Sequence, residues 1–395
     1  MFSWKVAPAL ATGNCIVIKS SELTPLSALK MAELIKQAGF PPGVFNLVTG
    51  YGPTAGAAIA NHMDIDKVAF TGSTLVGRNI MKAAAQTNLK KVTLELGGKS
   101  PNVILKDADL DQAVSWAAFG FTFNTGQTCC AGTRVYVEEA IYDQFMEKML
   151  AKVNSIKTAD GFKEDTFAGP QVSQAQFDRV MKYIESGKES GAKVAAGGHR
   201  VGEEGYFVAP TVFTDVNPDA TISREEIFGP VVVVHKFKDQ DELIRVANDT
   251  IYGLACAIFS RDIGRALDTA HKIKAGTAWV NCINILTPQV PFGGFKASGI
   301  GRELGEVSRI VMGFRSALAD LSALSHSTPL PTIRTSSRFT STFRCRARSK
   351  QADFHLRDLS VCCSIAQVLV SRTLQHKTPL ARAFMYSFSC SIPSS

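Results

Sequence analysis

The sequence predicts an α/β fold, and three observations support this prediction. Short β-rich runs alternate with helical runs from residue 13 to residue 96, which is typical of a parallel sheet covered by helices. Two glycine-bearing turns follow strands of this region, where such sheets hold phosphates. Hydrophobic residues make up 45% of the 395 residues and charged residues 20%, so the chain can bury a core and is not disordered throughout.

The first part of the chain is predicted to run β-α-β-α-β-α-β. Thr24 and Pro25 supply an N-cap and a first-turn proline for the first helix, and Gly39 closes it. Its apolar face is expected to comprise Leu26, Leu29, Met31, Leu34 and Ile35. The other two helices are expected over residues 55–60 and 73–85, and the strands over residues 14–19, 43–49, 67–71 and 91–96.

The middle of the chain predicts a second α/β unit. Residues 109–123 are expected to form a helix with Asp109 as its N-cap, and residues 134–137 a strand. Helices expected over residues 141–156 and 174–189 are amphipathic, so they are assigned to the layers of this unit and given no cofactor role.

Two turns of the first unit are candidate phosphate sites. Each leads into a helix whose first free N–H groups and positive dipole end can hold a pyrophosphate, while glycine lets the backbone come close. Neither turn has the Gly-x-Gly-x-x-Gly spacing, so an ordinary strand-to-helix turn remains the alternative for each one taken alone. The turns are Gly50-Tyr-Gly52-Pro-Thr-Ala-Gly56 and Thr71-Gly72-Ser73-Thr74-Leu-Val-Gly77.

Lys19 and Glu22 follow the first strand and have two interpretations. A carboxylate at this place can accept hydrogen bonds from a ribose. A solvated ion pair near a helix start is the alternative, and the two residues alone favour it.

A polar loop over residues 124–132 contains two adjacent thiols, Cys129 and Cys130, between two glycines. A free cysteine is usually a small buried apolar residue. A thiol in a glycine-flanked loop is a better candidate for a nucleophile, because a nucleophile must meet its substrate and benefits from nearby backbone N–H groups.

Glu95 is the second candidate catalytic group, because it stands near the end of an apolar strand and directly before Leu96-Gly97-Gly98-Lys99. An acid in such a place is costly unless it is paired or employed. Its burial would raise its pKa towards the range that suits a general base. An edge-strand or salt-bridged glutamate is the alternative.

The net charge of +8 arises at one end of the chain. Residues 307–395 hold 12 Lys and Arg against three acids, with 17 serines, one glycine and no glutamate, whereas residues 1–306 have a balance of −1. The last segment is therefore expected to be a tail without a core of its own. Nucleic-acid binding through this tail would depend on charge alone, so no nucleic-acid partner is predicted.

The nine cysteines follow neither a zinc spacing nor a disulfide framework, so no metal site is predicted and a reducing compartment is favoured. The start of the chain has no secretory or transit pattern. No apolar run reaches the ~18 residues that a membrane span needs, so no membrane partner is predicted. A cytoplasmic location follows, with mitochondria left open.

Five motifs, in order, resemble signatures of the aldehyde dehydrogenase superfamily, and the chain is similar to it from Met1 to Glu306. They are Phe70-Thr-Gly-Ser73, Val92-Thr-Leu-Glu95-Leu-Gly-Gly-Lys99, Gly126-Gln127-Thr-Cys129, Glu225-Glu226-Ile-Phe228-Gly-Pro230, and Pro291-Phe-Gly-Gly-Phe-Lys-Ala-Ser-Gly299 leading into Gly301-Arg-Glu-Leu-Gly-Glu306.

The resemblance implies a role for each matching residue. Cys129, not Cys130, matches the nucleophile, because the family thiol is the second residue after the Gly-Gln pair, and Glu95 matches the general base. The implied cofactor-binding residues are Lys19 and Glu22 at the adenosine ribose, Gly52, Gly72, Ser73 and Gly77 in the phosphate turns, and Glu226 and Phe228 around the nicotinamide ribose and ring.

The implied reaction is oxidation of an aldehyde to a carboxylic acid with hydride transfer to NAD(P)+, through a Cys129 thiohemiacetal and a thioester. NAD is favoured over NADP, because Glu22 would repel a 2′-phosphate. CoA-acylating relatives pass the thioester to a thiol, and Glu95 favours hydrolysis instead. The aldehyde itself is not fixed by the sequence.

The resemblance also divides the chain. It implies a partial dinucleotide-binding domain over residues 1–97, a catalytic domain over 98–297, the end of the family match at 298–306, and a Ser/Arg-rich tail over 307–395 that is disordered or artefactual. The family's second oxyanion donor, an asparagine, and part of its pairing elements match no residue here. A truncated or mis-predicted gene product is therefore expected, with an inactive fragment that associates with full-length subunits of the homo-oligomeric family as the alternative.

Overall fold

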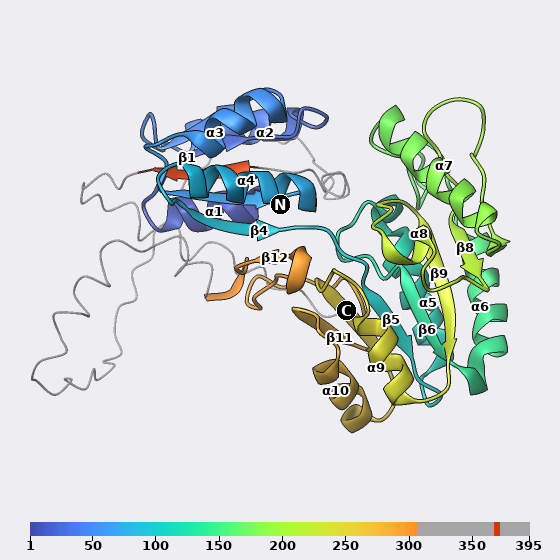
Figure 1. Ribbon diagram of the computed structural model, residues 1–395. Coiled ribbons are helices and arrows are strands. Elements are labelled where there is room, and N and C mark those ends of the chain that lie inside the picture. The colour runs from blue at the N-terminus through green and yellow to red at the C-terminus, as the bar shows by residue number, and fades with distance from the viewer. Residues whose placement is uncertain (307–366, 372–395) are drawn as a thin grey trace, which may run out of the picture.

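The computed structural model describes residues 1–306 and 367–371, and it contains two sheets with helices on both faces (Figure 1). The predicted α/β class is confirmed. The first sheet is formed by β1 (Cys15–Lys19), β2 (Phe45–Val48), β3 (Lys67–Thr71), β4 (Lys91–Glu95), β12 (Gly299–Ile300) and β13 (Gln367–Ser371). The second sheet is formed by β5 (Pro101–Ile104), β6 (Arg134–Glu138), β7 (Lys193–Ala196), β8 (Thr211–Thr214), β9 (Val231–Phe237), β10 (Ala255–Phe259) and β11 (Thr277–Val280).

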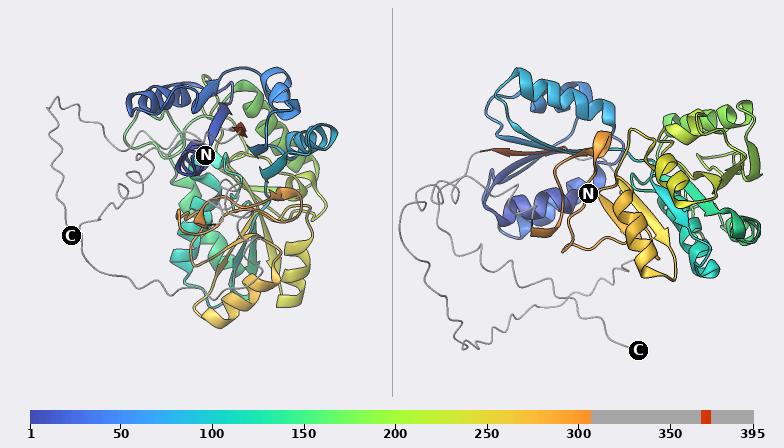
Figure 2. Two further views of the ribbon diagram at one scale, coloured as in Figure 1. Left: turned by 90° about the vertical axis from the view of Figure 1, so that its left-hand side faces the viewer. Right: turned by 60° about the horizontal axis from the view of Figure 1, so that its bottom comes forward.

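Four helices cover the first sheet, whose strand order is β12-β4-β3-β13-β1-β2. They are α1 (Phe2–Ala11), α2 (Leu26–Gln37), α3 (Ala57–Asn61) and α4 (Thr74–Gln86), with the π-turn η1 (Gly52–Gly56) before α3. Alternate residues of β1 face opposite sides: Ile16 and Ile18 pack with α1, whereas Val17 joins the cluster formed with α3 and α4. Helices therefore cover both faces of this mixed sheet (Figure 2).

The second sheet has the order β11-β10-β5-β6-β9-β8-β7, and its pairs are parallel except β7 with β8. Helices α5 (Leu110–Thr122) and α6 (Tyr142–Asn154) pack on one face, and α9 (Gln240–Asn248) and α10 (Ile263–Lys272) on the other. Helix α7 (Gln174–Glu189) and the short α8 (Thr221–Arg224) cover β8 and β9. Three single 3-10 turns complete the described elements: η2 (Phe123–Gly126), η3 (Glu139–Ile141) and η4 (Lys296–Ser298).

The predicted strands and helices of both units are confirmed to within a few residues, and the caps explain why. The Ser73 hydroxyl accepts a hydrogen bond from the backbone N–H of Val76, and the Asp109 carboxylate accepts one from Gln112, so each satisfies a donor that a helix start leaves free. Glycine at position 39, with φ of +84°, ends the segment after α2 as predicted.

Three features differ from the sequence-based expectation. Helix α1 was not predicted, and it carries Pro8 in its interior, a residue that usually argues against a helix. The apolar face expected on α2 is largely exposed, with Leu26 at 77%, and Ala28 is its one buried residue. Strand β13 comes from the predicted tail and lies antiparallel between β1 and β3. The remainder of the tail lies outside the described residues.

The two sheets meet where β4 ends. Five residues, Leu96 to Ser100, follow Glu95 before the chain enters β5 of the second sheet, so one nearly continuous segment serves both sheets (Figure 1). Strand β12 returns from the second sheet to pair antiparallel with β4, through Gly299 opposite Glu95. The carboxyl end of β4 and the amino ends of β5 and β6 thus enclose one junction.

Candidate active site

Glu95 is the last residue of β4 and is 3% exposed. Its backbone carbonyl accepts a hydrogen bond from the N–H of Gly72, which ties it to the turn before α4. One side-chain oxygen, Oε2, has no hydrogen-bond partner among the described residues. Burial raises the pKa of Glu95 to about 9, against a weaker opposing effect of the Lys5 ammonium. The direction agrees with the prediction that desolvation prepares this acid for proton transfer.

A buried charged group lies beside Glu95. Lys5 of α1 is fully buried, and its ammonium forms an ion pair with Glu303 and donates a hydrogen bond to Thr71 Oγ1 at 3.0 Å. Sequence reasoning assigned no role to Lys5 or Glu303. The available signal was a lysine within an apolar helical run near the start, and Glu303 stands inside one of the recognised motifs.

The loop that carries Cys129 begins with an unusual backbone. Asn124 (φ 51°) and Thr125 (φ 55°) are consecutive left-handed residues, and Gly126 follows with φ of 71°. A Cβ at Gly126 would overlap the backbone of Gly229, so the loop packs directly on the turn that follows Phe228. This compact start brings Cys129 back to the amino end of β6.

The two thiols have different surroundings. Cys130 is buried, and its Sγ lies 3.3 Å from Asn284 Oδ1, to which it donates. Cys129 is partly exposed and packs on the edge of the apolar core cluster. The pKa of Cys129 is raised, first by its hydrogen bond with Cys130, then by burial, and then by the nearby Glu226 and Glu95 carboxyls. The structure therefore brings both predicted catalytic groups and Glu226 into one electrostatic environment.

A pair of glycines separates these groups. The N–H of Gly98 donates to Glu226 Oε1 at 3.2 Å, and a Cβ at Gly97 would overlap the Glu226 carboxylate. A Cβ at Gly98 would overlap the carbonyl oxygen of Cys129. Burial raises the pKa of Glu226 to about 7. The Gly97-Gly98 pair therefore fits between the Glu226 side chain and the nucleophile loop because it has no side chains.

The other predicted cofactor residues lie at the carboxyl ends of the first sheet's strands. Lys19 ends β1, and its ammonium lies 3.1 Å from Glu22 Oε2, while the neighbouring Ser20 hydroxyl is buried with no partner in the described part of the chain. Gly72 and Ser73 form the turn into α4. Gly77 lets α4 approach β4 closely, since a Cβ there would lie 2.8 Å from Leu96 Cδ2.

Gly52 and Phe228 complete the predicted set. Gly52 opens the π-turn η1 after β2, and no atom lies within 4 Å of where its Cβ would be. Phe228 is left-handed, with φ of 59°, and its carbonyl oxygen accepts a hydrogen bond from Gln176 Nε2 at 2.8 Å. The predicted cofactor residues thus belong to separate turns. Each turn lies either at the carboxyl ends of the first sheet's strands or at the junction of the two sheets.

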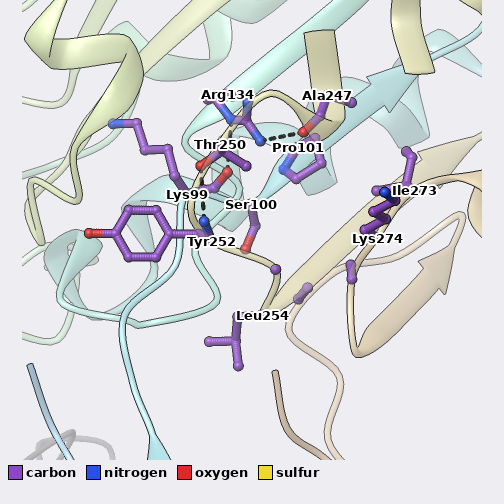
Figure 3. A pocket seen from close by; sticks show the side chains of 13 residues that line it. Lys99, Ser100, Pro101, Arg134, Ala247, Thr250, Tyr252, Leu254, Ile273 and Lys274 are labelled. Atoms are coloured by element: carbon purple, nitrogen blue, oxygen red, sulfur yellow. Dashed lines mark hydrogen bonds between the residues drawn. The ribbon is translucent and has the colours of Figure 1, made fainter. Parts of the chain in front are cut away.

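A small, partly open pocket lies at the amino ends of β5, β6 and β10 (Figure 3). Its lining includes Lys99, Arg134 and Tyr252 and none of the predicted site residues. Lys99 is 1% exposed, and its ammonium has no hydrogen-bond partner within the described ranges. Burial and the nearby Arg134 lower the pKa of Lys99 to about 7.

The described residues contain no cluster of three or more His, Cys, Asp or Glu side chains that could hold a metal ion. Within the same ranges, none of the helices has the length and apolar character that crossing a membrane requires.

Comparisons with known proteins agree with the motifs. A model of the aldehyde dehydrogenase family matches residues 1–312, six residues beyond the limit of the sequence resemblance. An aldehyde dehydrogenase of Agaricus bisporus is 64% identical over 306 residues, which cover 78% of this chain and 61% of that protein. The mitochondrial aldehyde dehydrogenase of Sus scrofa is 56% identical over 306 residues, covering 78% of this chain and 59% of its own length.

A solved structure of similar sequence is the NAD+ complex of an aldehyde dehydrogenase from Bacillus cereus. It is 54% identical, with a TM-score of 0.77, and the match covers 78% of this chain and 63% of that one. The chain thus spans less than two thirds of the length of each of these relatives. The family match nevertheless covers most of the chain and includes every predicted site residue, so the chain belongs to the aldehyde dehydrogenase family.

Proposed function

We propose that this chain carries the site for NAD+-dependent oxidation of an aldehyde to a carboxylic acid. The observation that supports the proposal most strongly is the convergence of Cys129, Glu95 and Glu226 at the junction of the two sheets, where the Gly97-Gly98 pair that follows Glu95 meets both the Glu226 carboxylate and the carbonyl oxygen of Cys129. A nucleophile, a buried acid and a cofactor-side carboxyl are the groups that this reaction requires.

The residues of the first sheet fit a dinucleotide. The buried Ser20 hydroxyl has no partner among the described residues, and it stands beside the Lys19–Glu22 pair, so an unused polar group faces the place assigned to a ribose. The capped start of α4 offers backbone N–H groups to a pyrophosphate at Gly72 and Ser73. Glu22 favours NAD+ over NADP+, because it would repel a 2′-phosphate. When bound, the nicotinamide accepts the hydride that the substrate loses.

The chain's own residues carry the covalent steps. The Cys129 thiol gives its proton to solvent water and its sulfur attacks the aldehyde carbon, so a C–S bond forms and the carbonyl oxygen becomes an alkoxide held by the Cys129 backbone N–H. When the alkoxide reforms its C=O bond, hydride leaves the carbon and a thioester remains. Glu95 then takes a proton from water, the hydroxide adds to the thioester, and the Cys129 sulfur leaves as the acid forms.

Aromatic side chains in the same apolar cluster as the thiol favour an aldehyde with an apolar substituent. Cys129, Trp4, Phe119 and Phe292 belong to one apolar cluster, and the rings of Trp4 and Phe292 stand edge to face at 5.5 Å. An apolar group buried among such rings is stabilised by about 25 cal/mol per Å².

A spectrophotometric assay tests this proposal. The purified chain is mixed with acetaldehyde and NAD+, and NADH absorbance is followed for the wild type, Cys129→Ala and the matched control Cys130→Ala. We expect activity in the wild type and in Cys130→Ala, and its loss in Cys129→Ala. Equal activity with or without Cys129, or none in any protein, would contradict the proposal, and the second result favours an inactive fragment.

A further inference from the structure

The nucleophile loop adopts a conformation that its own residues disfavour. Asn124 and Thr125 are both left-handed, and left-handed backbone is sterically costly for a β-branched residue such as Thr125. Such conformations persist only where the surroundings hold them. The contacts of Thr125 therefore indicate what fixes the loop four residues before Cys129.

A short strap, defined as Gly169-Pro170-Gln171-Val172, is hydrogen-bonded to this loop. The loop donates two hydrogen bonds to the strap, from Thr125 Oγ1 to Gly169 O at 3.3 Å and from Gln127 Nε2 to Pro170 O at 3.4 Å. The strap donates two in return. Gln171 Nε2 reaches Thr125 O at 3.3 Å, and the Val172 N–H reaches Gln127 Oε1 at 2.9 Å.

Gln171 is the buried side chain of this strap. It is 1% exposed, and its backbone N–H donates to Tyr206 O at 2.8 Å, so the backbone from which its side-chain amide extends is held in place. A similar arrangement recurs five residues later, where Gln176 Nε2 donates to the carbonyl oxygen of Phe228. Thr125 and Phe228 are both left-handed, so two glutamines of one segment each hold the carbonyl of a residue in a disfavoured conformation.

We propose that Gln171 is a positioning residue that holds Thr125 in its left-handed conformation and thereby keeps the Cys129 thiol beside Glu95 and Glu226. The catalytic part of this inference depends on the proposed function, whereas the position of the thiol does not. When the amide is lost, Thr125 relaxes, the loop moves away from its packing on Gly229, and Cys129 leaves the two carboxyls.

The test compares Gln171→Met with Gln174→Met in the full chain. Methionine keeps the length of glutamine but removes the donor, and Gln174 is an exposed residue of α7 whose amide bonds Asp178. Two quantities are measured: the rate at which iodoacetamide alkylates Cys129 across pH, with the site verified by mass spectrometry, and kcat with KM for NAD+.

The two quantities should move in opposite directions. A thiol that leaves Glu95, Glu226 and Cys130 regains a more ordinary pKa, so Gln171→Met should be alkylated about tenfold faster at neutral pH. Its kcat should fall by about 10- to 100-fold, because the nucleophile is misplaced, while KM for NAD+ stays the same. Gln174→Met should match the wild type.

Rescue separates positioning from general stability. Glycine adopts the left-handed conformation without strain, so adding Thr125→Gly to Gln171→Met should restore most of the kcat and the wild-type alkylation profile. Unchanged alkylation and kcat in Gln171→Met, or a failure of Thr125→Gly to restore either, would overturn the proposal. Faster alkylation of Gln171→Met in a protein whose wild type makes no NADH would sink the proposed function alone.

Discussion

The site contains three acidic groups whose simultaneous ionisation is unfavourable. Burial raises the pKa of Glu95 to about 9 and that of Glu226 to about 7, and both carboxyls raise the pKa of the Cys129 thiol. Because these groups interact, removing a proton from one makes removal from the next more costly, and their titrations belong to the set. Proton transfer at this site therefore depends on which group ionises first.

The buried Glu95 predicts a pH dependence of both activity and stability. The fraction of Glu95 that is ionised increases as pH rises towards about 9, so hydrolysis of the thioester should accelerate over that range. Its folded pKa lies above the unfolded value of 4.5, so folding stability should fall as pH rises from 4.5 to about 9. Glu95→Gln should lower kcat by about 10²-fold or more. Its rate should no longer rise with pH at the alkaline end. Between pH 5 and pH 8 it should lose less folding stability than the wild type does.

Rate–pH profiles and urea unfolding at pH 5 and pH 8 measure these effects. A Glu95→Gln protein with the wild-type profile would show that another group is the base.

Single residues could be predicted where their type conflicts with their surroundings. Glu95 inside an apolar strand and Cys129 in a glycine-flanked loop carry that conflict in the sequence itself. Lys5 and Gln171 show no such conflict in the sequence, because their roles depend on partners distant in the chain. Lys5 is 298 residues from Glu303, and Gln171 is 46 residues from Thr125.

At the scale of elements, strands and capped helices with local signals were predicted, and elements without them were not. Asp109 caps α5 as expected, since capping is a contact between near neighbours. The predicted cap at Thr24 is wrong, because Pro25 occupies the N-cap position of α2 and no side chain caps that helix. The two-residue β12 is too short for a period, and it forms because Gly299 meets Glu95 across the junction. Apolar spacing on α2 predicted a helix correctly but did not reveal that Leu26 would be exposed.

The ion pair of Lys5 and Glu303 joins α1 and the segment after β12 to the end of β3. Removing one partner leaves a buried charge, so Lys5→Met should destabilise the protein by about 3–5 kcal/mol. The double variant Lys5→Met/Glu303→Leu should recover most of this loss. Urea unfolding measures both, and Lys148→Met provides a control, because its solvent-exposed pair with Asp111 should contribute little to stability. A single variant as stable as the control would contradict this account.

At the scale of the whole molecule, the charge balance changes close to the residue where the family match ends. The net charge of +8 combines a balance of −1 over residues 1–306 with +9 over residues 307–395, and the family model ends at residue 312. Yet β13, from the second of these segments, lies between β1 and β3 in the first sheet. Composition distinguished the segment but gave no sign of this pairing.

Deleting residues 307–395 should therefore affect the two sheets differently. Without β13, the facing edges of β1 and β3 lose their antiparallel partner, so their amide hydrogens should exchange faster, by about tenfold or more. Strands β5, β6 and β10 pair only with strands that the deletion keeps, and their exchange should be unchanged. Hydrogen exchange with mass spectrometry measures both sheets at once, and equal exchange of β1 with and without the segment would contradict this role of β13.

The continuity of β4 with β5 has a consequence for motion. Only Leu96 to Ser100 separate the two strands, so a rotation of one sheet against the other turns about a pivot next to Glu95. Points near a pivot move little, whereas Lys19 and Glu22, at the end of β1, are farther from it along the first sheet. Opening and closing of the two halves would therefore carry Lys19 and Glu22 through a wide arc and leave Glu95 almost stationary relative to Cys129.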